Sequence, residues 1–339
     1  MVWERLGSAS VGGATAATSW KELGRTTLGS SGSSIDVTSL SGKQNLMILA
    51  DVRDMDNIHL TFNNDSGNNY AYRESVNGGS DSTSTSQAKI ELEAQSQQKQ
   101  FAVSNVINIS GQEKLLLSHT ASNNNGGATN VPVRAETVGK WANTSAQITS
   151  VKLSRTGSND FTSGSEVVVL GYDDDEADSG TNFWQELASV ELSSGATSID
   201  TGTFTAKKYL MFQLNANNTA NLYPYMRFNG TVGNEYAYRK QANGTADSTN
   251  TSQPQISVYA SDKNDSLVTG YILNNTKERL AIIESISAFT AGAANPPQRY
   301  ETVGKWANTS NAITSLKIFG GNGSEQFLSG TTLKVWGSD

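Results

Sequence analysis

The sequence predicts an all-β protein built from two tandem antiparallel β-sandwich domains of jelly-roll type. Three observations support this prediction: long segments occur twice, apolar and polar residues alternate over short runs, and turn residues separate those runs. A chain of 339 residues is long enough for two domains with separate cores. The repeat period of about 165 residues is far longer than a solenoid unit, so each copy is expected to fold around its own core.

The duplication is visible along almost the whole chain. Residues 20–23 (WKEL) return as 184–187 (WQEL), residues 70–73 (YAYR) return as 236–239, and residues 136–145 return unchanged as 301–310. The matches keep the same order and nearly the same spacing. Two copies of one domain therefore account for most of the sequence.

The matches also define the boundaries. The first copy is predicted to span residues 20–172 and the second residues 184–339, after an N-terminal arm at 1–19. Residues 173–183 carry five carboxylates and are expected to form a solvated acidic linker. A calcium site was the alternative for this run, but its spacing does not match an EF-hand loop.

Within each copy the hydrophobic period is two. Ile90 and Leu92 alternate with polar residues, and Ile256 and Val258 repeat the pattern. Hairpin turns are predicted at Asn-Gly pairs, residues 77–78 and 243–244. We expect about nine to eleven strands in each copy and find no helical period, a pattern typical of a sandwich.

Composition excludes several classes of function. The net charge is −7 and no basic block occurs, so nucleic acid is not expected as a partner. No apolar run approaches the ~20 residues of a membrane span, so no membrane is expected either. The first residues lack the features of a secretory signal. The chain has no cysteine, which excludes disulfides and thiolate metal sites.

Several landmarks recur in one order in both copies. A Trp-x-x-Leu opening is followed by Phe-Asn at 62–63, by 67–73 (GNNYAYR), and by a closing segment at 161–171. This order resembles jelly-roll virion structural proteins of tailed phages, of the capsid decoration or fibre type. The resemblance implies a structural or attachment role on a virus particle, a homo-oligomer that contacts other virion proteins, and assembly in the host cytoplasm. It assigns no functional residue.

Catalytic chemistry finds little support in the residues. The two histidines, His59 and His119, have no histidine at the matching place in the other copy, and no Gly-x-Ser-x-Gly or His-Glu-x-x-His motif occurs. Glu136 and Glu301 each follow an arginine by two positions, and residues two apart on a strand share a face. We therefore expect ion pairs there. The sequence predicts no enzyme, no metal and no cofactor.

Aromatic residues repeated in both copies are the candidate recognition residues. Tyrosines two apart on a strand project from one face, where they could stack on sugar rings or fill a subunit interface. The alternative is that they pack in the sandwich cores. The candidate interface or glycan-contact residues are Tyr70, Tyr72, Tyr236, Tyr238, Trp141 and Trp306.

The expected function is therefore a non-enzymatic structural virion component that coats, cements or projects from a phage-like particle. The alternative is an adhesive module that binds surface glycans through both copies, with linkage giving avidity. A glycan-cleaving enzyme, which would need a pair of carboxylates, is a third interpretation.

Overall fold

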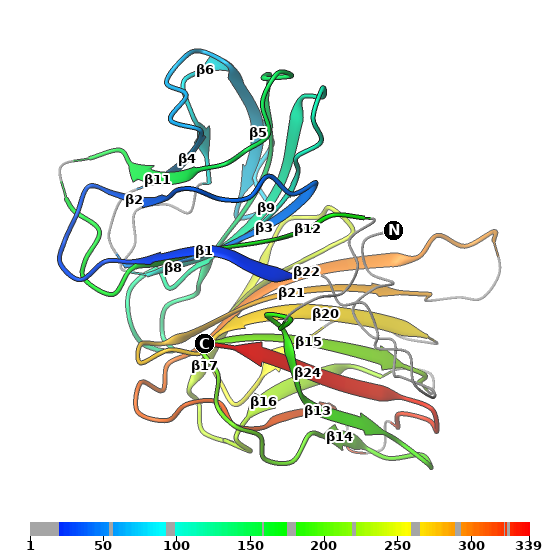
Figure 1. Ribbon diagram of the computed structural model, residues 1–339. Coiled ribbons are helices and arrows are strands. Elements are labelled where there is room, and N and C mark those ends of the chain that lie inside the picture. The colour runs from blue at the N-terminus through cyan, green and yellow to red at the C-terminus, as the bar shows by residue number, and fades with distance from the viewer. Residues whose placement is uncertain are drawn as a thin grey trace.

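The computed structural model describes residues 20–53, 57–92, 99–157, 159–174, 181–218, 222–258, 265–288, 293–321, 323 and 326–339. Over these residues the protein consists of 24 β-strands and contains no helix. The predicted arm at 1–19 and residues 175–180 of the predicted linker lie outside the described residues. Strands β1 to β12 form one pair of sheets and strands β13 to β24 form another (Figure 1).

The first copy has a larger and a smaller sheet. The larger sheet follows the order β1 (Lys21–Thr27), β12 (Glu166–Tyr172), β3 (Asn45–Val52), β8 (Gln100–Ile107), β9 (Lys114–Ser122), β10 (Val133–Trp141), β5 (Tyr70–Val76) and β6 (Ser82–Gln87). The smaller sheet follows the order β2 (Ser34–Val37), β11 (Val151–Arg155), β4 (Ile58–Phe62) and β7 (Ile90–Glu91).

The second copy repeats this order strand for strand. Its larger sheet consists of β13 (Gln185–Glu191), β24 (Thr332–Ser338), β15 (Tyr209–Ala216), β20 (Ser266–Leu273), β21 (Arg279–Ser287), β22 (Gln298–Trp306), β17 (Tyr236–Ala242) and β18 (Ser248–Gln253). Its smaller sheet consists of β14 (Ser198–Asp200), β23 (Leu316–Gly320), β16 (Pro224–Phe228) and β19 (Ile256–Ser257).

The strand order is that of a jelly roll with two insertions. The smaller sheet β2-β11-β4-β7 covers the inner face of the larger one, with β2 against β1 and β12 and β7 against β5 and β10, and the chain crosses between the two sheets at most steps. The hairpins β5–β6 and β9–β10 then extend the larger sheet by four strands. The fold class predicted from the sequence, two tandem antiparallel β-sandwiches, is confirmed. Over the described residues each copy has twelve strands rather than nine to eleven, and a strand such as β6 (STSTSQ) has no apolar residue that could show alternation.

Alternation places one face of the strands that lie between the sheets in a sandwich core. In β4, Ile58, Leu60 and Phe62 are fully buried between the sheets of the first copy. Gly139 of β10 lets β7 approach closely, because an added Cβ there would lie 2.9 Å from the Cδ1 of Ile90. These buried contacts form because every second side chain of a strand points to the same face of the sheet.

The predicted Asn-Gly turns are present in both copies. Asn77 and Gly78 join β5 to β6 with φ values of 54° and 69°, and Asn243 and Gly244 join β17 to β18 with φ values of 51° and 75°. Two successive residues with positive φ match the twist of a tight hairpin. Asparagine and glycine are the residues that adopt this conformation at least cost.

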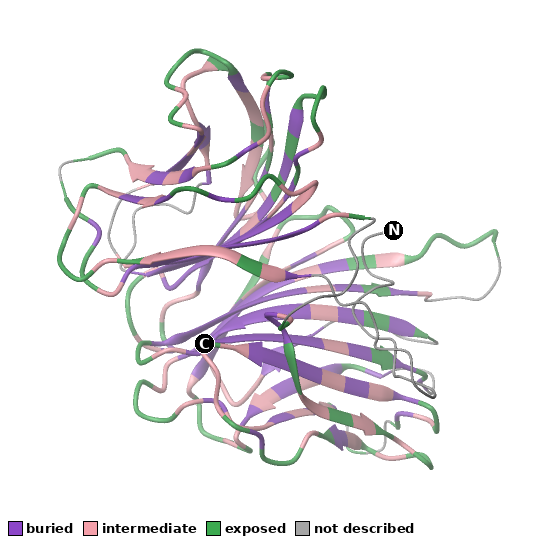
Figure 2. Cartoon of the chain, viewed as in Figure 1, coloured by how far each residue is buried: buried purple, intermediate pink, exposed green. Residues whose placement is uncertain are grey.

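The two copies pack against each other through the outer faces of their larger sheets, which gives four layers. A continuous buried apolar cluster joins them and includes Phe101 and Leu170 of the first copy with Tyr209, Ile282 and Trp336 of the second. Figure 2 shows buried residues along the strands of both larger sheets. The cores of the two sandwiches are thus separate from this third cluster between them.

The described ends of the predicted linker are held in place. Asp173 accepts hydrogen bonds from the backbone N–H of Gln44 and from the Lys43 ammonium, at 2.8 and 3.0 Å. Phe183 and Trp184 are buried in the cluster between the copies. The solvated linker expected at 173–183 is therefore anchored at both described ends.

Candidate functional site: the cleft between the larger sheets

The aromatic residues selected from the sequence lie in the sandwich cores. Tyr70 and Trp141 of the first copy, and Tyr236, Tyr238 and Trp306 of the second, are at most 5% exposed. A ring enclosed on both faces cannot stack on a sugar or contact a neighbouring subunit. The structure therefore assigns these five rings to packing, the alternative that the sequence left open.

The polar atoms of Tyr70 and Trp141, and of Tyr236 and Trp306, form hydrogen bonds inside their own domains. The Tyr70 hydroxyl accepts a hydrogen bond from the backbone N–H of Phe62 at 3.0 Å, and burial raises the pKa of Tyr70 to about 12. The indole N–H of Trp141 donates to Asp65 at 2.7 Å. Tyr70 and Trp141 are directly opposite in β5 and β10, and their rings stack with centroids 6.3 Å apart. Tyr72, the sixth candidate, is half-buried and donates to Glu91 at 3.0 Å.

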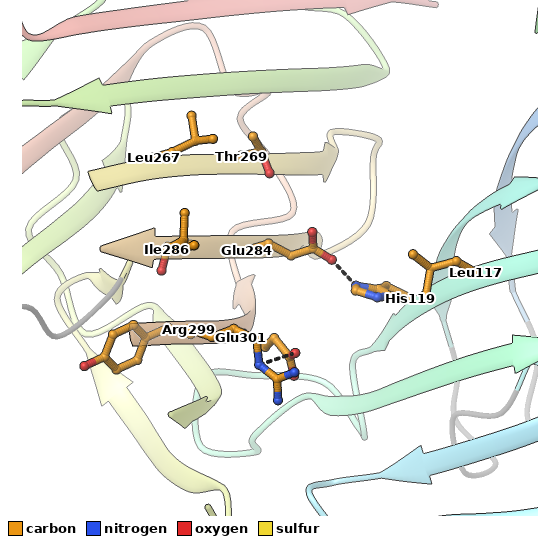
Figure 3. A pocket seen from close by; sticks show the side chains of 10 residues that line it. Leu117, His119, Leu267, Thr269, Glu284, Ile286, Arg299 and Glu301 are labelled. Atoms are coloured by element: carbon orange, nitrogen blue, oxygen red, sulfur yellow. Dashed lines mark ion pairs between the residues drawn. The ribbon is translucent and has the colours of Figure 1, made fainter. Parts of the chain in front are cut away.

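A cleft of about 300 Å³ opens instead between the two larger sheets (Figure 3). Leu117 of β9 forms one wall, and Leu267 of β20 and Ile286 of β21 form part of the other. Each of these side chains is at least one-third exposed. The cleft thus has apolar walls that solvent reaches.

Charged residues at the base of the cleft occupy matching positions in the two copies. His119 lies opposite Glu136 across β9 and β10, and Glu284 lies opposite Glu301 across β21 and β22. The register therefore makes His119 the counterpart of Glu284. His119 Nδ1 contacts the Glu284 carboxylate, as Figure 3 shows. A residue that contacts its own counterpart lies on a twofold axis. A local pseudo-twofold axis that relates the two copies therefore passes between His119 and Glu284.

Arginines complete the base of the cleft. Arg134 is buried, and its guanidinium donates to Glu301 at 2.6 Å and to Asp247 at 2.9 Å. Arg134 also pairs with Glu136 in its own copy, and Arg299 lies 3.3 Å from Glu301. The Arg-x-Glu ion pairs predicted from the sequence are confirmed in both copies. Each glutamate at the base of the cleft therefore has a basic side chain beside it.

On one side of the axis, buried polar contacts hold the two copies together. The Lys99 ammonium donates to the Asn275 side chain at 2.6 Å and to the Glu278 carbonyl at 2.7 Å. Burial lowers the pKa of Lys99 to about 7. Lys305 donates to the carbonyl oxygens of Asn123 and Asn125, each at 2.8 Å.

On the same side of the axis, two buried carboxylates of the first copy form ion pairs with the second copy. Asp51 and Glu166 face each other across β3 and β12, and the Lys208 ammonium of the second copy lies 3.3 and 2.9 Å from them. Tyr209 also donates to Glu166 at 2.9 Å. Burial raises the pKa of Glu166, but hydrogen bonds from Thr27 and Lys208 outweigh it, so the pKa lies below its usual value.

Sequence reasoning did not find this interface, although one signal was present. Asp51 and Glu166 are charged, whereas the strand register places Asn215 and Thr332 at the same positions in the second copy. A charge that occurs in only one of two duplicated domains marks a position where their surroundings differ. His119 and Glu301 were each noted in the sequence, but nothing local indicated that they would share a cleft.

The described residues contain no group of three or more His, Asp or Glu side chains arranged as metal ligands. The described part of the chain also has no helix suited to crossing a bilayer.

Comparisons with known proteins leave the family open. No protein-family model and no curated sequence matches the chain. Among solved structures, domains LG4-5 of the mouse laminin alpha1 chain are 10% identical, with 95% of this chain and 92% of that chain covered and a TM-score of 0.20. Neisserial surface protein A is 9% identical, with coverages of 82% and 97% and a TM-score of 0.13. Such low scores carry no argument, so the fold description rests on this chain's own strand pairing.

Proposed function

We propose that this protein is a non-enzymatic structural component of a phage-like virus particle and acts through the surfaces of its β-sandwiches. The observation that carries the proposal is the continuous apolar cluster between the two copies. It joins two similar jelly rolls into one unit with fixed relative orientation. Such a unit presents two related surfaces at a defined spacing, which suits a repeating lattice.

The cleft supports a structural role over catalysis. A glycoside hydrolase needs one carboxyl group as proton donor and a second as nucleophile or base. Here Glu284 contacts His119, and Glu301 is held by Arg134 and Arg299. Ion-paired carboxylates of this kind are typical of a packed interface. The proposed site of action is the virion, with copies of this chain and other virion proteins as partners.

Density-gradient sedimentation of particles from the native source tests this function. After washing at high salt, quantitative mass spectrometry of the particle band measures the amount of this chain relative to the major capsid protein. We expect a fixed ratio of the two proteins across preparations. A chain that stays at the top of the gradient, with no constant ratio in the particle band, would overturn the proposal.

Glycan binding is the second candidate, and the cleft is the observation that favours it. Thr269, Arg299 and Glu301 line the cleft beside apolar walls, and a few polar groups among apolar ones are typical of small-ligand sites. A glycan array with the full chain tests this function. Binding that Arg299→Ala weakens, while Val232→Ala at an exposed loop leaves it unchanged, would support adhesion. An array without signal would exclude this candidate.

A further inference from the structure

Lys99 of the first copy places a buried amine directly beside a side-chain amide of the second copy. Lys99 is 2% exposed, and its Nζ lies 2.6 Å from the Oδ1 of Asn275 and 2.7 Å from the backbone carbonyl oxygen of Glu278. Both acceptors are neutral groups, and burial lowers the pKa of Lys99 to about 7. A large share of the amine is therefore uncharged at neutral pH, and an uncharged amine is a nucleophile.

The Cγ carbon of Asn275 lies within reach of this amine. A C=O bond is about 1.23 Å long, so a nitrogen 2.6 Å from Oδ1 lies no more than about 3.8 Å from Cγ. Reacting atoms about 3–3.5 Å apart are in position to form a bond, and a small side-chain movement covers the difference. The backbone N–H of Lys277 donates to the same Oδ1 at 3.0 Å. It thus points at the oxygen that becomes negative when an amine adds to Cγ.

A buried carboxylate lies at the other end of the same amide. The Nδ2 of Asn275 donates to the Oδ2 of Asp51 at 2.8 Å, and Asp51 is fully buried. The Oδ1 of Asp51 is also buried and has no hydrogen-bond partner among the described residues, which is uncommon for a buried polar atom. Asp51 also interacts electrostatically with Lys99. A carboxylate in this place can carry a proton from the amine to the amide nitrogen.

Apolar rings surround the carboxylate. Asp51 lies opposite Phe101 across β3 and β8, and the ring of Phe101 packs near that of Tyr209 with centroids 6.3 Å apart. Both rings belong to the buried cluster between the copies. Because such surroundings exclude water, they limit competing attack by water on the amide.

The duplication shows that the fold itself does not require these side chains. The counterparts in the other copy carry different chemistry: Asn215 for Asp51, Asp265 for Lys99 and Ile109 for Asn275. A sandwich of the same strand order therefore forms without them. An amine, an amide and a carboxylate thus meet at a contact between the copies, each at a position where the other copy has a different residue.

We propose that Lys99 and Asn275 form an isopeptide bond that joins the two copies covalently. The lone pair of Nζ attacks Cγ, and the carbonyl π electrons move to Oδ1, where the N–H of Lys277 stabilises the charge. Asp51 takes one proton from Nζ and passes it to Nδ2. The Cγ–Nδ2 bond then breaks, the carbonyl forms again and ammonia leaves. One amine and one amide give one new amide and one ammonia, so the reaction needs no oxidant and no further reactant.

The bond goes beyond the proposed function and does not depend on it. It links residues 176 positions apart, and a cross-link that closes a long loop restricts the unfolded chain. The two jelly rolls would then stay joined even when the contacts between them open. Only a chain without the bond carries a titratable amine at Lys99.

Mass spectrometry of the full chain under denaturing conditions tests the proposal. After incubation at mildly alkaline pH, the wild type is expected to be lighter than its sequence by the mass of one ammonia molecule. Trypsin should then leave residues 90–114 uncleaved after Lys99 and joined to residues 264–277. Asn275→Ala lacks the electrophilic carbon and Asp51→Asn lacks the proton carrier, so both are expected to keep their full mass. Asn215→Ala, at the exposed counterpart of Asp51, is the matched control and is expected to lose ammonia like the wild type.

The branched peptide distinguishes this reaction from succinimide formation at an Asn-Gly turn, which also releases ammonia. Three results would each overturn the proposal: a wild type that keeps its full mass, an ammonia loss without the branched peptide, or an equal loss in the Asn275→Ala chain. A bond that forms as completely in Asp51→Asn would overturn the role of Asp51. The wild-type measurement needs no variant to fold, and circular dichroism verifies folding of the three variants.

Discussion

His119 and Glu284 occupy the same register position in the two copies and contact each other across the interface. In a symmetric dimer, the two subunits would make the same contacts on both sides of such a point. Here one side is closed by Lys99, Lys208 and Lys305, and the other side opens into the cleft. The duplication thus placed two similar sheets face to face, and sequence differences between the copies closed one side.

Arg134 should be the most important ion-pairing residue of the interface. Its replacement by alanine removes the nearest cation of Asp247 and Glu301, which keep only Arg239 at 3.7 Å and Arg299 at 3.3 Å, and both carboxylates are largely buried. Removing one partner of a buried pair costs about 3–5 kcal/mol, so we expect a loss of this size in the free energy of unfolding. Urea denaturation measures it. Arg299→Ala, the counterpart with a side chain 60% exposed, is the control and should cost less than about 1 kcal/mol. Equal losses for both would contradict the assignment.

The core aromatics should control folding and not recognition. Trp141→Ala and Trp306→Ala each remove a fully buried ring and should cost about 3–5 kcal/mol of stability. Calorimetry measures the loss, and Val232→Ala at an exposed position serves as control. If either tryptophan variant folded with wild-type stability but lost binding on a glycan array, its assignment to packing would be incorrect.

Two glycines on equivalent strands should not tolerate a side chain. A Cβ at Gly139 would lie 2.9 Å from Ile90, and one at Gly304 would lie 2.7 Å from Ile256. Overpacking of this kind costs about 1–3 kcal/mol, so each alanine variant should unfold at a lower urea concentration. Gly29, where a Cβ would meet no atom within 4 Å, provides the control. An unchanged midpoint for both core variants would contradict the close approach of the sheets.

Burial of Lys99 predicts a pH dependence with a definite sign. Burial lowers its pKa from 10.5 to about 7, so above that pH the unfolded chain binds more protons than the folded chain. Stability contributed by this group therefore rises from about pH 7 to about pH 9, by up to about 1.4 kcal/mol per pH unit. Urea unfolding of the unlinked Asn275→Ala chain across this range measures the slope. Adding Lys99→Met should flatten it, whereas adding Lys140→Met, at an exposed lysine, should not. A slope that Lys99→Met leaves unchanged would contradict the shifted pKa.

Most of the fold could be predicted because its signals are local. Alternation in segments such as 58–62 and the Asn-Gly pairs at 77–78 and 243–244 reflect backbone geometry that neighbouring residues determine. The same reasoning placed Tyr70 and Tyr72 on one face of a strand. It could not decide whether that face points into a core, because the answer depends on the strands packed above it.

The interface between the copies could not be predicted from local sequence patterns, for a physical reason. Leu117 and Ile282 have the same side-chain character and the same register, yet Leu117 is 47% exposed and Ile282 is 4% exposed. Ile282 lies in the cluster between the copies and Leu117 lines the cleft, and the contacts that join the copies link residues far apart in sequence, such as Glu166 and Lys208. A repeated pattern therefore predicts repeated folds, but not repeated surroundings.

Cryo-electron microscopy of particles from the native source tests the central claim most directly. A reconstruction that resolves side chains should show this chain as a regular element of the particle, at a fixed ratio to the major capsid protein. Particles that lack the chain at any regular position would contradict the structural role.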